Sequence, residues 1–265
     1  MNTTADKPAE VRKPALQINT ISLHDIVACL RNGWRDFLAA PQYGLFFGAF
    51  YALGGNIIIA MAFFWGLSYL AYPLAVGFIL LGPFVAVGLY EVSRRLETGT
   101  PLTWKGVLGV IYEQRRHELP WMAFVVLFIF WIWIYQVRLL MALFLGMHAS
   151  ADLHRLVHEI FSTTDGWTFL VVGHLVGAVL SLLLFSVTVV SCPLLLDRNV
   201  DFITAIITSI KAVNVNTVPM LLWGVIVVLS MIAASIPAFL GLLFVLPILG
   251  HTTWHLYRRL VQHLA

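Results

Sequence analysis

The sequence predicts an all-α protein that crosses a membrane several times, and its composition, its apolar runs and an internal repeat support this fold class. Of the 265 residues, 60% are hydrophobic and only 11% are charged. Soluble domains carry about a quarter charged residues, so this balance excludes a soluble globular fold. The basic residues gather in a few loops, where they would meet lipid headgroups, and the net charge of +3 therefore predicts no nucleic-acid partner.

A repeated motif indicates that one helical unit occurs twice. The units are expected at about residues 21–96 and 200–260, on either side of a central helix pair at about 120–190. Each copy ends an apolar run with a basic cluster, so both copies should face the same side of the membrane. The motif is a pair of prolines followed by Arg-Arg-Leu, written once as Pro73, Pro83 and Arg94-Arg95-Leu96 and again as Pro237, Pro247 and Arg258-Arg259-Leu260.

The chain before residue 21 is predicted to be a disordered cytoplasmic tail, and residues 21–265 are predicted to form a single integral membrane domain. Residues 1–20 are polar and lack the apolar core of a secretory signal. Residues 21–40 then show an apolar stripe at helical spacing behind a capping box of Ser22 and Asp25, which predicts a helix lying in the cytoplasmic interface. The stripe consists of Leu23, Ile26, Val27, Leu30, Trp34, Phe37 and Leu38.

Six apolar runs are long enough to cross a hydrocarbon core of about 30 Å, which needs roughly 20 residues per helix. The first two runs, and the last two, are joined by turns so short that each pair should form a tight helical hairpin. The runs lie at about Gln42 to Trp65, Ser68 to Val92, Pro120 to Gly146, Trp167 to Val190, Val218 to Ser235 and Ile236 to Tyr257.

Lysine and arginine gather before the first run, between the second and third, between the fourth and fifth, and after the sixth. The positive-inside rule therefore places both termini in the cytoplasm. A second interfacial helix is expected at Asp201 to Val213, with isoleucines on one face and Asp201, Thr204, Thr208 and Lys211 on the other. Cys29 and Cys192 fall near cytoplasmic helix ends, where thiols stay reduced, so no disulfide is expected.

Several short motifs resemble those of one family of membrane proteins. They are Leu81-Gly82-Pro83-Phe84, Gly88-Leu89-Tyr90-Glu91, Ser93-Arg94-Arg95, the segment from Pro193 to Arg198 and the segment from Leu249 to Arg258. With these residues the chain resembles the integral membrane proteins grouped as domain of unknown function 2189. The resemblance covers nearly everything from the first amphipathic helix onward, and it implies a bacterial inner-membrane protein without an established activity.

Three ionisable residues near the cytoplasmic ends of the second and last runs could form a polar site. His251 and His255 are four residues apart and share one helical face, a spacing that can hold a metal ion. Glu91 occupies in the first unit the position of His255 in the second, so it could converge with the two histidines. In the alternative, the histidines bond to backbone or headgroups, and Glu91 pairs with Arg94 or Arg95 one turn on.

Four polar residues in the outer half of the spans are the candidate for a binding cavity. Arg138 lies inside the third run, where a charge marks either function or a side chain that reaches out to headgroups. His174 falls at a similar depth in the fourth run, and Gln136 and Asn56 also lie in the outer half. In the alternative, Arg138 extends outward to the headgroups and no cavity forms.

The loop after the third run contains His148, His154 and His158, and imidazole side chains suit zinc or copper. A solvated amphipathic loop helix explains the same residues, so no metal site is assigned and no cofactor is expected. The sequence contains no phosphate-binding loop, nucleophile elbow, HExxH or CxxC motif.

Three function classes follow from these patterns. The first is a non-catalytic component, an assembly or stabilising partner of an inner-membrane complex, which would bind the bilayer and another inner-membrane protein or a second copy of itself. The alternative is a small-solute or ion transporter that uses the outer polar cluster. A membrane-embedded enzyme using Glu91, His251 and His255 comes third, and the absence of catalytic motifs favours a protein that is not an enzyme.

Overall fold

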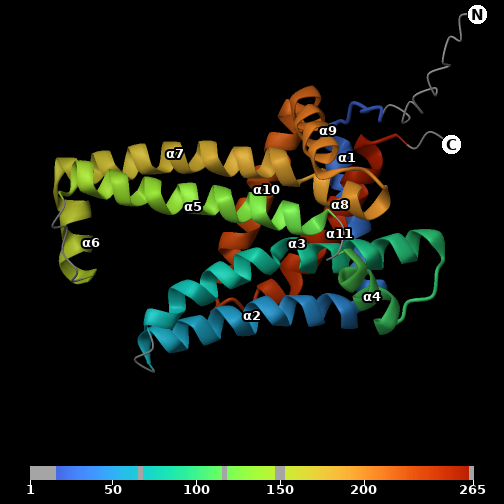
Figure 1. Ribbon diagram of the computed structural model, residues 1–265, viewed down its shortest axis with the longest axis horizontal. Helices are drawn as coiled ribbons and strands as arrows, with labels where there is room; N and C mark the ends of the chain where they lie inside the picture. Colours follow the sequence, from blue (N-terminus) through green and yellow to red (C-terminus); the bar gives the residue numbers. More distant parts are fainter. Residues whose placement is uncertain (1–15, 65–67, 115–117, 147–152, 263–265) are drawn as a thin grey trace, which may run out of the picture.

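The computed structural model describes residues 16–64, 68–114, 118–146 and 153–262. These residues confirm the expected all-α class; their one β-type contact is the isolated bridge between Ile18 and Val261. The helices are α1 (Leu23–Ala39), α2 (Pro41–Phe63), α3 (Ser68–Thr98), α4 (Trp104–Gln114), α5 (Leu119–Phe144), α6 (Leu153–Ser162), α7 (Thr164–Thr188), α8 (Ser191–Asp197), α9 (Phe202–Val215), α10 (Thr217–Ser235) and α11 (Leu242–Leu260) (Figure 1).

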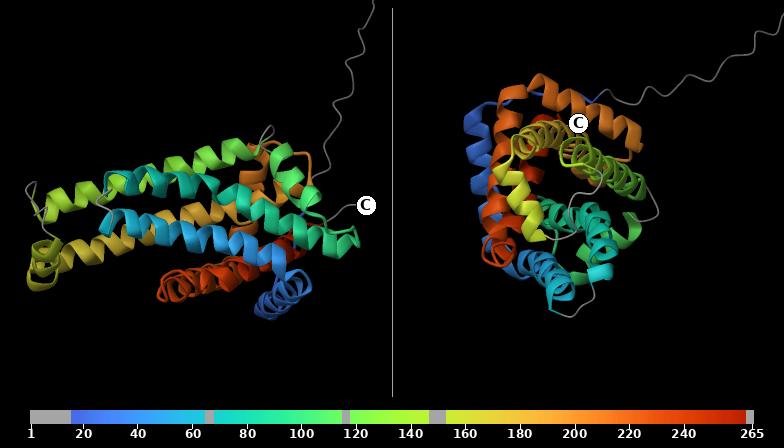
Figure 2. Two further views of the ribbon diagram at one scale, coloured as in Figure 1. Left: turned by 90° about the horizontal axis from the view of Figure 1, so that it is seen from below. Right: turned by 90° about the vertical axis from the view of Figure 1, so that its left-hand side faces the viewer.

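Two helix pairs set the long direction of the molecule. Helix α2 lies beside α3 and α5 beside α7, and the second pair extends further, to the end that α6 covers (Figure 1). Helix α1 runs across this direction, so the end view of Figure 2 shows it from the side while α5 and α7 point toward the viewer. Helix α11 packs against α1, α2 and α3, and it therefore joins the first hairpin to the rest of the bundle.

Four helical segments in the described part of the chain are long and apolar enough to cross a membrane: Pro41–Met61, Leu119–Phe144, Thr164–Asp197 and Thr217–Ser235. The structure therefore supports a multi-pass protein, with Phe202–Val215 as a further, shorter apolar helix. The remaining two predicted spans correspond to α3 and α11, and neither is among the four. For α11 the reason is its second half, which carries polar residues and the Arg258-Arg259 pair.

The last predicted run differs from the structure at its start. Helix α11 begins at Leu242, and the preceding residues form turns in which Ala238 and Phe239 have positive φ values of 50° and 61°. Pro237 has no backbone N–H to donate, which favours the end of α10 just before it. The carbonyl of Ala238 accepts a hydrogen bond of 2.6 Å from the Asn56 side chain, which fixes this turn against α2.

Helix α1 begins as predicted, with a capping box in which Ser22 and Asp25 bond to each other's backbone N–H. Its apolar stripe, however, splits into two faces. Ile26 and Phe37 are buried in the protein, as are Cys29 and Gly33, which the stripe did not include. The other face, formed by Leu23, Val27, Trp34 and Leu38, is about half exposed. One face thus packs on α11, and the second remains available to lipid.

The face that α9 buries differs from the one predicted for the second amphipathic segment. Its cap is Asp201, whose side chain accepts from the Thr204 N–H at 2.8 Å. Thr208, predicted on the polar face, is only 6% exposed, whereas Ile203 and Ile207 face outward. Small residues let α9 approach α7 and α8, and the bulky isoleucines then point toward the surroundings. The buried face consists of Ala205, Thr208, Ser209, Ala212 and Val213.

The end of the predicted tail is part of the fold. Ile18 pairs with Val261, and the backbone N–H of Asn19 donates to Leu260 at 2.8 Å, so this segment lies along the end of α11. The buried side chain of Asn216 accepts from the Ile21 N–H and donates to the Asn19 carbonyl. Residues 1–15 of the predicted tail lie outside the described residues.

Glycines allow α11 to approach two helices closely. A Cβ atom on Gly33 of α1 would lie 2.7 Å from the Thr252 backbone nitrogen and 2.9 Å from the Ile248 carbonyl oxygen. At Gly48 of α2 it would lie 2.7 Å from the carbonyl oxygen of Leu243. Backbone atoms cannot move aside as a flexible side chain can, so these two crossings require a residue without a Cβ.

Replacing Gly33 by Ala is therefore expected to destabilise the protein. Overpacking typically costs about 1–3 kcal/mol, and here the clash involves backbone atoms of α11. The matched control is Gly109→Ala in α4, where a Cβ would meet nothing within 4 Å and the helix should gain stability. Thermal unfolding of both variants in one detergent measures the difference, and equal melting temperatures would contradict the close crossing.

Candidate functional site

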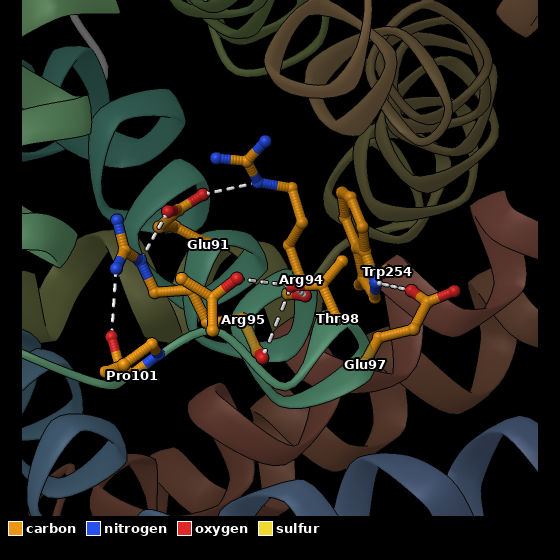
Figure 3. A network of polar contacts seen from close by, with 8 residues as sticks. Glu91, Arg94, Arg95, Glu97, Thr98, Pro101 and Trp254 are labelled. Carbon is orange, nitrogen blue, oxygen red and sulfur yellow. Dashed lines mark hydrogen bonds and ion pairs between the residues drawn. The ribbon is translucent and has the colours of Figure 1, made fainter.

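The charged end of α3 holds a buried carboxylate between two arginines. Glu91 is fully buried, and its two oxygens accept from the Nε atoms of Arg94 at 2.7 Å and Arg95 at 2.6 Å (Figure 3). The spacings of three and four residues place all three side chains on one face of the helix. Arg95 also donates to the Pro101 carbonyl. Both oxygens of Glu91 therefore bond within α3. This agrees with the alternative interpretation of the sequence, in which Glu91 pairs with Arg94 or Arg95.

A second group of charges connects three helices at the same end. Glu97 of α3 accepts from the indole N–H of Trp254 at 3.0 Å (Figure 3). It also accepts from Arg258 of α11 at 2.8 Å. The Asp197 carboxylate at the end of α8 accepts from the Tyr257 hydroxyl at 2.7 Å and lies 3.7 Å from Arg258. Because each anion has cationic or hydroxyl partners from another helix, the network fixes how α3, α8 and α11 meet.

The two histidines of α11 have separate partners. The Nδ1 atom of His251 lies 2.8 Å from the Ser93 hydroxyl, and the Nε2 atom of His255 lies 2.7 Å from the Asp36 carboxylate. Ser93 belongs to α3 and Asp36 to α1, so the two histidines bond to different helices. Within the described ranges no three His, Cys, Asp or Glu side chains are grouped as a metal ion would need. The structure does not bring Glu91, His251 and His255 together.

The start of α1 and the end of α11 meet through Asp25 and Arg259, which form an ion pair. The hydrogen bonds that Asp25 accepts from the backbone and hydroxyl of Ser22 lower the pKa of this carboxyl, and Arg259 adds to the effect. Cys29, one turn further along α1, is a free and buried thiol, and burial raises its pKa to about 11. Cys192 is likewise free and buried, which agrees with the expectation of no disulfide.

The four residues of the predicted outer cavity have different surroundings. Asn56 donates to Ala52 and Ala238 and so belongs to the contact between α2 and the α10–α11 turn. His174 lines a cavity of about 400 Å³ between α5 and α7, where its Nδ1 lies 2.6 Å from the Leu170 carbonyl oxygen. Arg138 is exposed on α5 and does not line that cavity. The Gln136 amide is buried without a hydrogen-bond partner in the described structure.

The histidines of the predicted outer loop are only partly described. His148 lies outside the described residues, and His154 lies in α6 with a side chain that is also outside them. His158 lies on α6 and is exposed. The metal hypothesis for this loop therefore stays a prediction.

Sequence reasoning missed the partners that complete these contacts. Asp36 and Ser93 hold His255 and His251, and Glu97 and Asp197 hold Arg258, yet none was a candidate. Glu97 follows Arg95 at the end of the repeat motif, so its charge beside a basic cluster was an available signal. Asp36 carried no such signal, because its partner lies 219 positions away in the chain.

Residues 71–197 match a family whose description is "Predicted integral membrane protein (DUF2189)". Searches of curated proteins and of solved structures give no match.

Replacing Glu91 by Gln should destabilise the charged end of α3. The change removes two charge-assisted hydrogen bonds from a fully buried group and leaves two arginines without their counter-ion, which costs about 1–3 kcal/mol. Glu113→Gln on the exposed surface of α4 is the matched control. Chemical unfolding of both variants measures the two free energies; a loss no larger for Glu91 than for Glu113 would contradict the assigned role.

Proposed function

We propose that this chain, of which residues 71–197 match the DUF2189 family of predicted integral membrane proteins, serves as a non-catalytic component of a membrane complex, an assembly or stabilising partner. The observation that carries the proposal is the exposed aromatic face of α5. This helix has 26 residues and reaches about 39 Å, more than the roughly 30 Å of a hydrocarbon core. The face consists of Trp121, Phe124, Phe128, Trp131 and Tyr135, each more than half exposed.

Aromatic side chains are favoured where one protein binds another, because they present a large contact area with little conformational freedom to lose. The α5–α7 hairpin also extends beyond the α2–α3 pair, so its far half has free sides (Figure 1). A helix that faced lipid alone would need only aliphatic residues along its middle. The aromatic content of α5 therefore supports a protein partner.

The use of the charged residues supports the same function. Glu91 bonds to arginines of its own helix, and the bonds of Glu97, Asp197 and Asp36 connect helices. Groups that bind one another so closely are held for structure and are poorly placed to take or give a proton during catalysis.

We include in the proposal six spans, a parallel internal repeat, both termini in the cytoplasm and an inner-membrane location. The pairing of Glu97 with Arg258 supports the parallel repeat, because it joins the basic ends of α3 and α11. Helices α3 and α11 then cross the membrane with polar ends that extend into the interface, where Arg94 and Arg258 meet headgroups.

This topology predicts the behaviour of reporter fusions. A reporter enzyme that is active only outside the cytoplasm should be inactive when fused after Ala265 and active when fused after Gly146, at the end of α5. Enzyme activity in intact cells, normalised to the amount of fusion protein, measures both. Activity at Ala265 would contradict the assigned orientation.

The transporter alternative depends on Arg138 and His174 sharing one cavity. His174 lines the cavity between α5 and α7, but Arg138 is exposed outside it and Asn56 belongs to another contact. These positions favour the structural function over transport.

Copurification tests the proposed function. The tagged protein, extracted from membranes in mild detergent, should bring down a membrane protein or a second, differently tagged copy in stable proportion. Replacing Phe128 and Trp131 together by Ala should reduce that recovery at least five-fold, because both lie at the centre of the exposed face. The control replaces Val225 and Leu229 of α10, which are also exposed. A protein that always runs alone, or recovery that falls equally in both variants, would contradict the proposal.

A further inference from the structure

The depth of α1 in the membrane follows from the helix that comes after it. A single residue, Ala40, separates the end of α1 from Pro41, where the candidate span Pro41–Met61 begins. A span begins where the hydrocarbon core begins, so the end of α1 lies at the boundary between hydrocarbon and headgroups. Helix α1 also runs across the long direction of the helix pairs, and its whole length therefore stays near that boundary (Figure 2).

Helix α1 presents three faces to different surroundings. The first packs on α11 and includes Gly33 and Phe37. The second is apolar and about half exposed, and it consists of Leu23, Val27, Trp34 and Leu38. The third borders the second, because Arg31 and Arg35 come four and eight residues after Val27 and so lie about 40° and 80° further around the helix. Both arginines are exposed.

The two arginines of this third face have no anion to pair with among the residues that the structure describes. Their side chains make no hydrogen bond or ion pair there. The acidic residues of α1 are both engaged by α11, since Asp25 pairs with Arg259 and the Asp36 carboxylate lies 2.7 Å from the Nε2 atom of His255. The outer surface of α1 is therefore cationic, and an anion that neutralises it must come from elsewhere.

We propose that α1 binds anionic phospholipids, with their phosphate groups against Arg31 and Arg35 and their acyl chains against the apolar face. An amphipathic helix at the membrane surface buries its apolar face below the headgroups, so basic side chains at the border of that face lie at the level of the phosphates. A guanidinium group donates two parallel hydrogen bonds to a phosphate, which suits arginine to this contact. Trp34 is half exposed and favours the same depth, because indole rings collect at the membrane interface. The site does not rest on the partner proposed above, which is assigned to α5.

Native mass spectrometry of the full chain tests the site. The protein in mild detergent is titrated with phosphatidylglycerol, or with phosphatidylcholine of the same acyl chains, and the bound lipids are counted. We expect phosphatidylglycerol to bind at least five-fold more tightly. Arg31→Gln combined with Arg35→Gln should weaken phosphatidylglycerol at least ten-fold and leave phosphatidylcholine unchanged, because each basic side chain near an anionic surface contributes about five-fold. Equal affinity of the unaltered protein for the two lipids would overturn the proposal.

Two further variants separate this site from a general effect of charge. Lys105→Gln combined with Lys211→Gln removes the same charge from two other exposed positions, and it should weaken phosphatidylglycerol less than two-fold. Arg31→Lys combined with Arg35→Lys keeps the charge and should retain most of the preference. Thermal unfolding checks that all three variants fold as the unaltered protein does. Equal losses in the two glutamine pairs would overturn the proposal.

The depth of α1 distinguishes a lipid from other occupants and needs no change at the arginines. A nitroxide label on Leu38→Cys, in nanodiscs that contain phosphatidylglycerol, should collide with oxygen more than with a water-soluble nickel complex, as should a label on Val225→Cys in the span of α10. The native thiols are buried, and the unaltered protein serves as the blank.

Three outcomes of these measurements name a different occupant. Preference for the nickel complex at Leu38 would place the face in water, and exclusion of both reagents would indicate a covering protein. Glycerol phosphate that displaces phosphatidylglycerol at similar concentration would indicate a site for soluble phosphates. Each of these results would overturn the proposal.

Discussion

The close approach of α11 to α1 and α2 is the constraint on which the rest of the structure depends. The crossings at Gly33 and Gly48 bring backbone against backbone, and this contact places the polar half of α11 between the first hairpin and α8. Only in that position can His255 reach Asp36 and Tyr257 reach Asp197. In a membrane, where apolar surface gains little by burial against other apolar surface, such close packing and the polar contacts it permits supply much of the association between helices.

The charged end of the bundle follows from the same constraint. A basic cluster at the end of a span favours the cytoplasmic interface, but a cluster packed against neighbouring helices must also be neutralised. Glu91 does so for Arg94 and Arg95 from within α3, and Glu97 and Asp197 do so for Arg258 from other helices. The arginines therefore help both to orient the helices in the membrane and to hold them together.

Hydropathy predicted the helix boundaries that depend on local composition. It could not predict contacts between segments that are far apart in the chain. The α2, α5 and α10 boundaries fall within a few residues of the expected runs, because an apolar run and a helix-starting residue such as Pro41 are local signals. The capping box at Ser22 is also local, and it was correct. The face that α9 buries was predicted wrongly, because small residues such as Ala205 and Ser209 pack inward only when a neighbouring helix is present.

The candidate sites illustrate the same limit more sharply. Spacing correctly identified that Glu91 could pair one turn on, since residues four apart share a helix face. It could not place Arg138 relative to His174, because depth in a membrane says nothing about which side of a helix faces its neighbour. The cavity of about 280 Å³ beside Tyr90 could not be predicted for a related reason, because the residues that line it come from six helices that are far apart in the chain.

The two copies of the repeated motif show how similar sequences come to do different work. In the first copy Glu91 neutralises the arginines of its own helix, so the end of α3 satisfies its charges without help. In the second copy His255 stands at the corresponding position and turns to Asp36 of α1 instead. The second arginine pair instead bonds to acidic residues of three other segments. Arg258 pairs with Glu97 and Asp197, and Arg259 pairs with Asp25. The arginines at the end of α3 thus pair within their own helix, whereas those at the end of α11 pair with residues of neighbouring segments and so help to hold the helices together.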